Sequence, residues 1–308
     1  MQHADPAGDG GSSESNPFGS ASDFPPPSAK VRVTFGTCSR TGRSHQVNGD
    51  HYLVIELGRY QETIRTSLPA DVIGKRFDEY GYAMVVADGL GGQRDSEEAS
   101  RLAIVTLMRL VLHFGKWNLR VDSRIAQEIM DRAEGFYRHV DSAVMYEGVS
   151  RGGRRLETTL TAVFGAGSDL FFAHVGHSRA YLFRDGQLMR LTRDQTIGRH
   201  RSSTVPVAPL VDVNLTARDL KHILTDTIGM GGSSGPMIDL ERFQLVDRDR
   251  ILVCTNGLTD LVEESAVAEV LASDQSPDDQ CRTLVDLAMT AGGHDDATAL
   301  VAQYHIPG

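Results

Sequence analysis

Short apolar runs and longer amphipathic stretches occur in separate blocks along this chain of 308 residues. The short runs are rich in β-branched and aromatic residues and predict strands. They cover residues 31–36, 51–57, 82–87, 160–164, 170–175, 179–183, 251–255 and 298–304. Segment 184–187 predicts a hairpin turn, because its Asp-Gly pair accepts the positive φ of a tight turn.

Apolar residues spaced three and four apart predict two long helices, from Ala103 to Phe114 and from Ile125 to Val144. Ser276, followed by Pro277, predicts the start of a third helix, and Gly292 predicts its end. Segments 58–80 and 193–237 are expected to be long connections. Because the helices form a block between blocks of strands, the pattern favours an α+β architecture with antiparallel sheets over a doubly wound parallel sheet.

Composition narrows the class of protein. Residues 1–29 are mostly Gly, Ser, Pro, Asp and Ala and predict a disordered tail, leaving one domain at 30–308. A formal net charge of −10 argues against a nucleic-acid binder. The three cysteines lie far apart, which excludes a disulfide framework and fits a reducing compartment. Without a signal peptide or a membrane-spanning run, we expect a soluble, cytoplasmic protein.

Small acidic or amide residues, each within three positions of a glycine, lie next to four of the apolar strands. Asp50 precedes one strand, Asp88 and Asn256 each follow one, and Asp295 and Asp296 precede the last. Carboxylate and carbonyl oxygens suit Mg²⁺ and Mn²⁺, and glycines let backbone carbonyls approach an ion. Each Asp-Gly pair alone reads equally as a turn. Together the four sites indicate a hard-cation site and a metal-dependent hydrolase.

Seven motifs along the chain add a family resemblance. They are Asn-Gly-Asp at 48–50, Val-Ala-Asp-Gly-Leu-Gly-Gly at 86–92, Glu-Thr-Thr-Leu-Thr-Ala at 157–162, His-Val-Gly-His-Ser-Arg-Ala-Tyr-Leu at 174–182, Leu-Thr-Arg-Asp at 191–194, Cys-Thr-Asn-Gly-Leu-Thr-Asp at 254–260 and Gly-Gly-His-Asp-Asp-Ala-Thr at 292–298. In this order and spacing, residues 31–305 resemble the bacterial metal-dependent serine/threonine protein phosphatases of the PPM, or type 2C, family. No single motif is specific, whereas the ordered set is.

The resemblance implies a four-layer α-β-β-α sandwich with two central antiparallel sheets. It also implies hydrolysis of phosphoserine and phosphothreonine by water that two Mn²⁺ or Mg²⁺ ions activate, with no phosphoenzyme. Carried over by position, Asp88 bridges both ions, the Gly89 carbonyl binds one, and Asp295 binds the other. Asp50 holds a metal-bound water, and Asn256 stands at the position of an aspartate ligand. These residues are the expected metal and catalytic set.

The chain departs from the family pattern at several of these positions. Asn256 offers a neutral amide oxygen where the family has a carboxylate, and His177 replaces the aspartate of a Val-Gly-Asp-Ser-Arg motif. Because both replaced aspartates help to hold a third ion in bacterial members, the third site is expected to be weak or absent. Gly49 replaces an acidic or amide residue. These changes leave a second hypothesis open, a weakened or inactive phosphatase-like module that binds phosphoproteins or a kinase.

Phosphate binding is also altered. His45 occupies the place of the family's phosphate-binding arginine, and Arg43, two residues earlier on an extended segment, faces the same side. We therefore expect Arg43, helped by His45, to bind phosphate. His174 and His177 are three residues apart on a strand and face opposite sides, which argues against a shared zinc ion and leaves His174 as a core residue. Asp296 is expected to be a turn residue.

The expected partners are phosphorylated proteins in a serine/threonine kinase pathway. The family resemblance makes a monomer the default, and neither nucleic acid nor membrane is expected as a partner. Substrate choice is assigned to the surface loops, above all 193–237.

Overall fold

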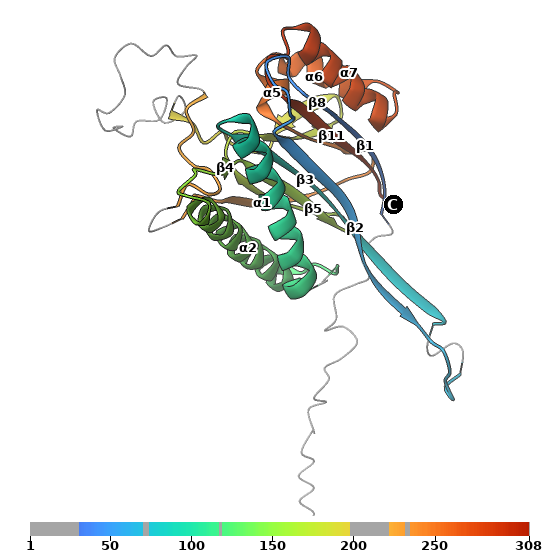
Figure 1. The fold of residues 1–308 in the computed structure, drawn as a ribbon. Coiled ribbons are helices and arrows are strands. Elements are labelled where there is room, and N and C mark those ends of the chain that lie inside the picture. Colours follow the sequence, from blue (N-terminus) through green and yellow to red (C-terminus); the bar gives the residue numbers. More distant parts are fainter. Residues whose placement is uncertain (1–30, 70–73, 117–118, 198–221, 232–234, 308) are drawn as a thin grey trace, which may run out of the picture.

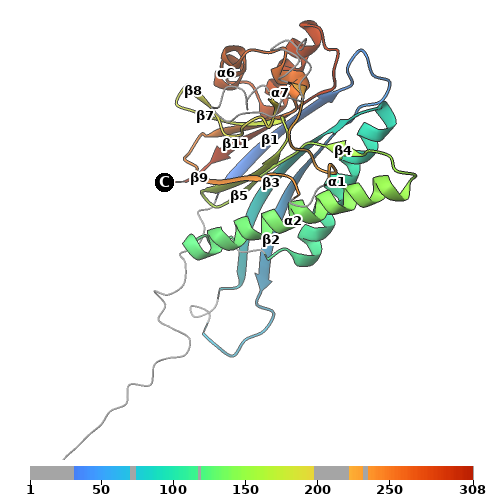
Figure 2. The ribbon, with the colours of Figure 1, turned by 90° about the vertical axis from the view of Figure 1, so that its left-hand side faces the viewer.

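Two antiparallel β-sheets pack face to face, and helices cover the outer side of each sheet (Figures 1 and 2). The computed structural model describes residues 31–69, 74–116, 119–197, 222–231 and 235–307. The predicted disordered tail at 1–29 therefore lies outside the described residues, as do residues 198–221 and 232–234 of the predicted connection 193–237. The α+β class and the four-layer arrangement are confirmed.

One sheet has the strand order β1-β11-β10-β7-β8, and the other has the order β2-β3-β5-β6-β9, with the short β4 paired to β3. The strands are β1 (Arg32–Arg40), β2 (Asp50–Glu62), β3 (Arg76–Leu90), β4 (Glu157–Thr158), β5 (Leu160–Ala166), β6 (Asp169–Val175), β7 (Arg179–Arg184), β8 (Gln187–Arg190), β9 (Asp239–Gln244), β10 (Arg250–Cys254) and β11 (Ala297–His305). The helices are α1 (Gln93–Phe114), α2 (Ser123–Ser150), α5 (Asn256–Thr259), α6 (Glu264–Ala272) and α7 (Pro277–Thr290).

Buried apolar side chains fill the three spaces between the four layers. One cluster, with Leu252 and Val285, lies between the first sheet and helices α6 and α7. A second, with Val86 and Val253, lies between the two sheets. A third, with Val140, lies between the second sheet and helices α1 and α2. These clusters hold the two sheets rigidly together, so the strand ends at one edge of the sandwich keep fixed positions.

The strongly periodic elements form where the pattern predicted them. Helix α2 begins after Asp122, whose carboxylate accepts a hydrogen bond from the Ile125 amide. In α7, the Ser276 hydroxyl accepts from the Asp279 amide, as predicted for an N-cap, and Pro277 is the first helical residue. Gly186 has a φ of 78°, which confirms the predicted hairpin turn between β7 and β8.

The prediction of a long connection at 58–80 is wrong. Strand β2 runs on to Glu62, and β3 already begins at Arg76, so most of this segment extends one hairpin. Figure 1 shows this hairpin reaching beyond the rest of the sandwich. Because its side chains there are mostly exposed, the segment lacks the buried apolar run that marks a strand in sequence. Its pairing comes from the register of the inner half of the hairpin.

Several short elements of the fold were not predicted from the sequence pattern. Strands β4 and β9 and helices α5 and α6 were missed, because they are short or carry mixed polar and apolar residues, whereas β8 is the second strand of the predicted hairpin. Within the described ranges, none of the helices has both the length and the apolar character needed to cross a bilayer.

Candidate metal centre

Asp50 and Asp88 face each other across neighbouring strands. Asp50 is the first residue of β2, Asp88 lies near the end of β3, and the two are direct partners in the antiparallel register. Directly opposed residues have Cβ atoms about 5 Å apart, and two like charges in such a pair repel each other. Both side chains are buried, at 5% and 8% exposure. Such a pair calls for a cation between or beside the two carboxylates.

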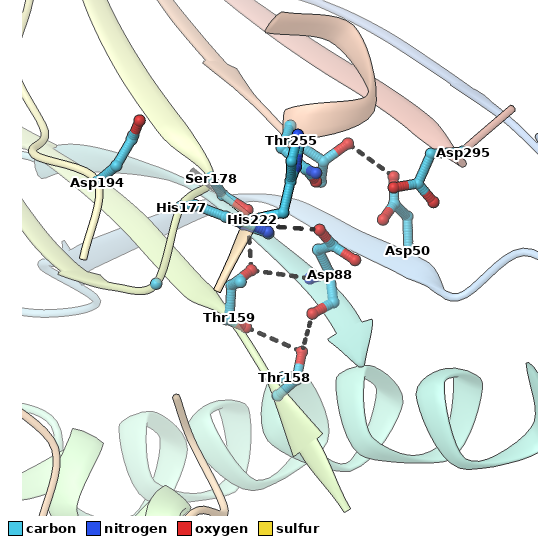
Figure 3. Close-up of polar contacts among 12 residues, drawn as sticks. Asp50, Asp88, Thr158, Thr159, His177, Ser178, Asp194, His222, Thr255 and Asp295 are labelled. Atoms are coloured by element: carbon cyan, nitrogen blue, oxygen red, sulfur yellow. Dashed lines mark hydrogen bonds and ion pairs between the residues drawn. The ribbon is translucent and has the colours of Figure 1, made fainter. Parts of the chain in front are cut away.

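Threonines hold both aspartates in place (Figure 3). Thr255 and Thr298 each donate a hydroxyl hydrogen bond to Asp50 Oδ2, at 2.8 and 2.7 Å. The Thr158 hydroxyl donates to the Asp88 carbonyl at 2.8 Å, and the Asp88 amide donates to Thr159 Oγ1 at 3.1 Å. Thr298 belongs to the sheet opposite that of Asp50 and Asp88, and Thr255 directly follows β10 of that opposite sheet. The polar contacts thus tie the two sheets together at the site.

Asn256 is the first residue of the short helix α5, directly after β10. Its amide nitrogen donates to Asp260 Oδ2 at 3.1 Å, which turns Oδ1 the other way. Asn256 Oδ1 is buried and has no hydrogen-bond partner among the described residues. The side chain is therefore held with a free oxygen, which is the donor a metal ligand needs.

Asp296 joins the loop before β2 to the turn before β11. Its Oδ1 accepts from the Gly42 amide at 2.7 Å, and its Oδ2 accepts from the Gly49 amide at 2.6 Å. His45 Nδ1 lies 3.1 Å from Asp296 Oδ2 and 3.9 Å from Asp295 Oδ1. Asp296 is thus more than the turn residue expected from sequence. It fixes the segment 42–49 over the site through two backbone hydrogen bonds.

A cavity of about 200 Å³ opens between these groups. Its lining includes six of the eight residues expected from the sequence, namely His45, Asp88, Gly89, His177, Asn256 and Asp295, together with Asp296. No lysine or arginine of the described residues lines it. Within this described lining, the acidic groups therefore have no lysine or arginine to balance them.

The pKa values of the aspartates reflect this excess of buried negative charge. Burial raises the pKa of Asp50 to about 7, against the opposing hydrogen bonds from Thr298 and Thr255. Burial, followed by the charge of Asp50, raises the pKa of Asp88 well above its usual range. Burial also raises the pKa of Asp295, while it lowers the pKa of His177 to about 4. A bound cation reverses these shifts for the carboxylates, because it stabilises their charged forms.

The donor set fits hard divalent cations. Among the expected site residues, three buried polar atoms lack a hydrogen-bond partner within the described part of the chain: Asp50 Oδ1, Asn256 Oδ1 and His177 Nδ1. A buried polar atom without a partner costs free energy unless another ligand satisfies it. Carboxylate and amide oxygens dominate the surroundings, and these are the ligands that Mg²⁺ and Mn²⁺ take in proteins.

Two glycines let helix α1 approach the site. A Cβ atom at Gly89 would lie 1.9 Å from the Ser96 carbonyl oxygen, so no side chain fits there. A Cβ at Gly49 would lie 2.7 Å from Ser96 Oγ. The side chain of Ser96 thus takes the space that a larger residue at position 49 would need. This contact gives a physical reason for the glycine that departs from the family pattern.

The structure separates the two residues expected to bind phosphate. His45 lines the cavity, whereas the exposed Arg43 donates from its guanidinium to the Met289 carbonyl at 2.9 Å and is not among the lining residues described. His174 and His177 also differ in their surroundings. His174 is buried and hydrogen-bonded to Thr161 Oγ1, as expected for a core residue, while His177 faces the cavity.

The family-model comparison decides the family. Residues 68–285, more than half of the chain, match the model described as protein phosphatase 2C. The chain belongs to the protein phosphatase 2C family. Asp50 and Asp295 lie outside the matched residues, so their place in the site depends on the register and contacts described above.

The curated relatives share less than a third of their aligned residues with this chain. The chain is 29% identical over 232 residues to the serine/threonine protein phosphatase PstP of Mycobacterium tuberculosis. The aligned region covers 71% of this chain and 40% of PstP. It thus spans about two fifths of the length of that relative.

Solved structures share the fold. A serine/threonine phosphatase of S. agalactiae superposes with a TM-score of 0.69 at 23% identity, covering 90% of this chain and 100% of that one. The catalytic domain of PstP, solved with two manganese ions, superposes with a TM-score of 0.65 at 23% identity, covering 89% and 99%.

Proposed function

We propose that this chain is a metal-dependent phosphatase that hydrolyses phosphoserine and phosphothreonine in proteins. The observation that carries the proposal is a cavity lined by the buried Asp88 and Asp296 and the more exposed Asp295, with no lysine or arginine in its described lining. The buried Asp50 lies opposite Asp88 in the neighbouring strand. Membership of the protein phosphatase 2C family supports it, and so does the shared fold with a PstP catalytic domain that holds two manganese ions. As in that protein, we propose two Mn²⁺ or Mg²⁺ ions as cofactors.

Some of the site residues would bind the cations directly, and others would position the ligands of those cations. Asp88, the Gly89 carbonyl, Asp295 and Asn256 Oδ1 would hold the ions, and Asp50 would orient water beside them. Divalent cations bound there supply Lewis-acid chemistry, which activates water and offsets negative charge on the phosphoryl group. Thr255 and Thr298 fix Asp50 through its Oδ2, while Oδ1 is buried without a hydrogen-bond partner among the described residues. The protein thus provides a preformed, acidic cradle.

Hydrolysis of p-nitrophenyl phosphate and of a phosphothreonine peptide tests the proposal. We expect turnover with Mn²⁺ or Mg²⁺ and none with EDTA, because the described cavity lining offers no lysine or arginine to stabilise the phosphoryl charge. Retained phosphopeptide binding without turnover at any metal concentration would contradict the proposal and favour a non-catalytic binding module.

His45 and Arg43 make separable contributions to phosphate binding. We expect His45→Ala to raise KM for the phosphopeptide about 10- to 100-fold, since a charge-assisted hydrogen bond contributes about 1.5–3 kcal/mol. Arg43→Ala should raise it less, because the guanidinium is bound to the Met289 carbonyl. Steady-state kinetics of both variants beside Gln46→Ala, a neighbouring exposed residue, provide the comparison. A larger effect of Arg43→Ala would show that the guanidinium leaves Met289 to bind substrate.

The setting of the reaction follows from the proposed activity. We propose that the substrates are phosphorylated by a serine/threonine kinase that the enzyme opposes, and that it acts as a cytoplasmic monomer on one domain at 30–308. Size-exclusion chromatography with light scattering checks the monomer.

A further inference from the structure

His177 lies in the cavity with an unused nitrogen. Its side chain is 9% exposed, and Nδ1 is buried with no hydrogen-bond partner among the described residues. Nδ1 lies 3.9 Å from Asp88 Oδ2, and Figure 3 shows the ring directed toward that carboxylate. This separation is too long for a hydrogen bond. Two ligand atoms at about 2.1 Å from one ion stand about 3 to 4.2 Å apart, so the separation suits a shared cation.

The segment around His177 is fixed on both sides of the ring. Gly176, with a φ of 110°, donates its amide hydrogen to Gln195 Oε1 at 2.8 Å. Ser178 Oγ is hydrogen-bonded to Thr159 Oγ1 at 2.8 Å, and Thr159 also accepts from the Asp88 amide. The imidazole and the Asp88 carboxylate therefore belong to one connected framework. The ring keeps its position beside Asp88 without a hydrogen bond through Nδ1 among the described residues.

His174, three residues earlier, shows what a structural histidine looks like in this fold. Its Nδ1 is hydrogen-bonded to Thr161 Oγ1 at 2.8 Å, and its Nε2 is 3.1 Å from the carbonyls of Gly176 and Arg193. Both nitrogens are thus satisfied by the protein. The side chain of His177 is also buried, but its Nδ1 has no hydrogen-bond partner among the described residues. This difference favours a ligand-binding role for His177 over a packing role.

Asn256 provides a second donor on the same cavity. Its Oδ1 is the other unpartnered atom among the lining residues, and its amide nitrogen is occupied by Asp260. Asp260 is itself held by His222, whose Nδ1 lies 3.5 Å from its Oδ2. Nitrogen from His177, amide oxygen from Asn256 and carboxylate oxygen from Asp88 thus line one space. Two of these three donors are neutral.

We infer that His177 Nδ1 is a metal ligand, binding a divalent cation together with Asp88 and Asn256 Oδ1, and that this site selects a transition-metal ion over Mg²⁺. The inference rests on the proposed metal-dependent function. Imidazole suits first-row transition metals, whereas Mg²⁺ prefers oxygen ligands, charged ones above all. The weak additional site expected from the sequence is accordingly weak for Mg²⁺ in particular.

Pulsed electron paramagnetic resonance of the full chain, loaded stepwise with Mn²⁺, tests the inference directly. We expect nitrogen hyperfine coupling from a bound imidazole, lost in His177→Gln and kept in His45→Gln. Coupling that disappears only in His45→Gln, or is never observed in the wild type, would overturn the inference. Thermal unfolding in EDTA checks that the variants fold, and His177→Asp, the residue of the family motif, is the second variant should His177→Gln not fold.

Calorimetric titration with Mn²⁺ and Mg²⁺ separates this inference from the proposed activity. We expect His177→Asp to lower the preference for Mn²⁺ over Mg²⁺ by about tenfold, the size of effect typical of changes in and around a metal's ligands. An unchanged preference would overturn the inference even if the wild type is an active phosphatase. Conversely, nitrogen coupling in a protein without turnover would leave the inference standing and refute the proposed function.

Discussion

Asp88→Asn is expected to lower kcat/KM for metal-dependent hydrolysis by at least about 10³-fold, because it removes the buried carboxylate at the centre of the site. Asparagine has nearly the same shape, and the backbone contacts of residue 88 with Thr158 and Thr159 remain available. The fold should therefore persist. Steady-state kinetics with saturating Mn²⁺, and calorimetry to measure metal binding, give the result.

Glu269→Gln serves as the matched control for Asp88→Asn. Glu269 is exposed on α6, on the outer layer of the sandwich, and the same charge change there should leave kinetics and metal binding unaltered. In EDTA, Asp88→Asn should unfold at a temperature no lower than the wild type, since it removes a charge that burial disfavours. An active Asp88→Asn variant would refute the placement of the metal centre.

Without metal, the free energy of unfolding should fall as the pH rises from about 4 to 7, by roughly 2–4 kcal/mol from Asp50 alone. Burial raises the pKa of folded Asp50 to about 7, whereas an unfolded aspartate titrates near 3.9. Between these values the folded state holds a proton that the unfolded state has lost, so the stability present at low pH is lost as the pH rises through 7. Urea unfolding in EDTA at several pH values measures the trend.

Asp50→Asn isolates the contribution of this residue to the trend. An asparagine oxygen can still accept from Thr255 and Thr298, while no charge develops as the pH rises. The variant should therefore be more stable than the wild type at pH 8 in EDTA and depend less on pH. Added Mn²⁺ should restore the wild type at pH 8, because a cation stabilises the ionised carboxylates. Equal pH slopes for wild type and variant would contradict the raised pKa.

The fold was predictable where one face of an element is buried. The apolar stripe of α2 and the Ser276-Pro277 start of α7 report on local physics that a sequence contains. The outer half of the β2–β3 hairpin was not predictable in this way, because its exposed residues, such as Tyr60, follow the register of the buried half. Strand β9 was missed for a related reason, since it mixes polar and apolar residues and pairs with β6 at the edge of its sheet.

In the candidate site, too, residues marked by a local sequence pattern were predictable, and those set by distant contacts were not. Ligand types next to strands identified Asp88, Asn256 and Asp295, because glycine and a small acid after an apolar run form a local signal. The threonines that hold Asp50 come from β11 and from the end of β10, and no local pattern marks them. The contact between Arg43 and Met289 is equally non-local. Distant contacts decide which of the predicted residues enter the cavity.

The position of β11 has a consequence for biosynthesis. This last strand lies between β1 and β10, with Arg32 opposite His305 at the far end of the β1–β11 pair. On the ribosome, β1 emerges before the other strands of its sheet and has no hydrogen-bonding neighbour there until residues 297–305 have been translated. The nascent polypeptide therefore exposes an unpaired edge while residues 41–296 are being translated. Cells that make this protein in quantity should depend on chaperones to protect that edge.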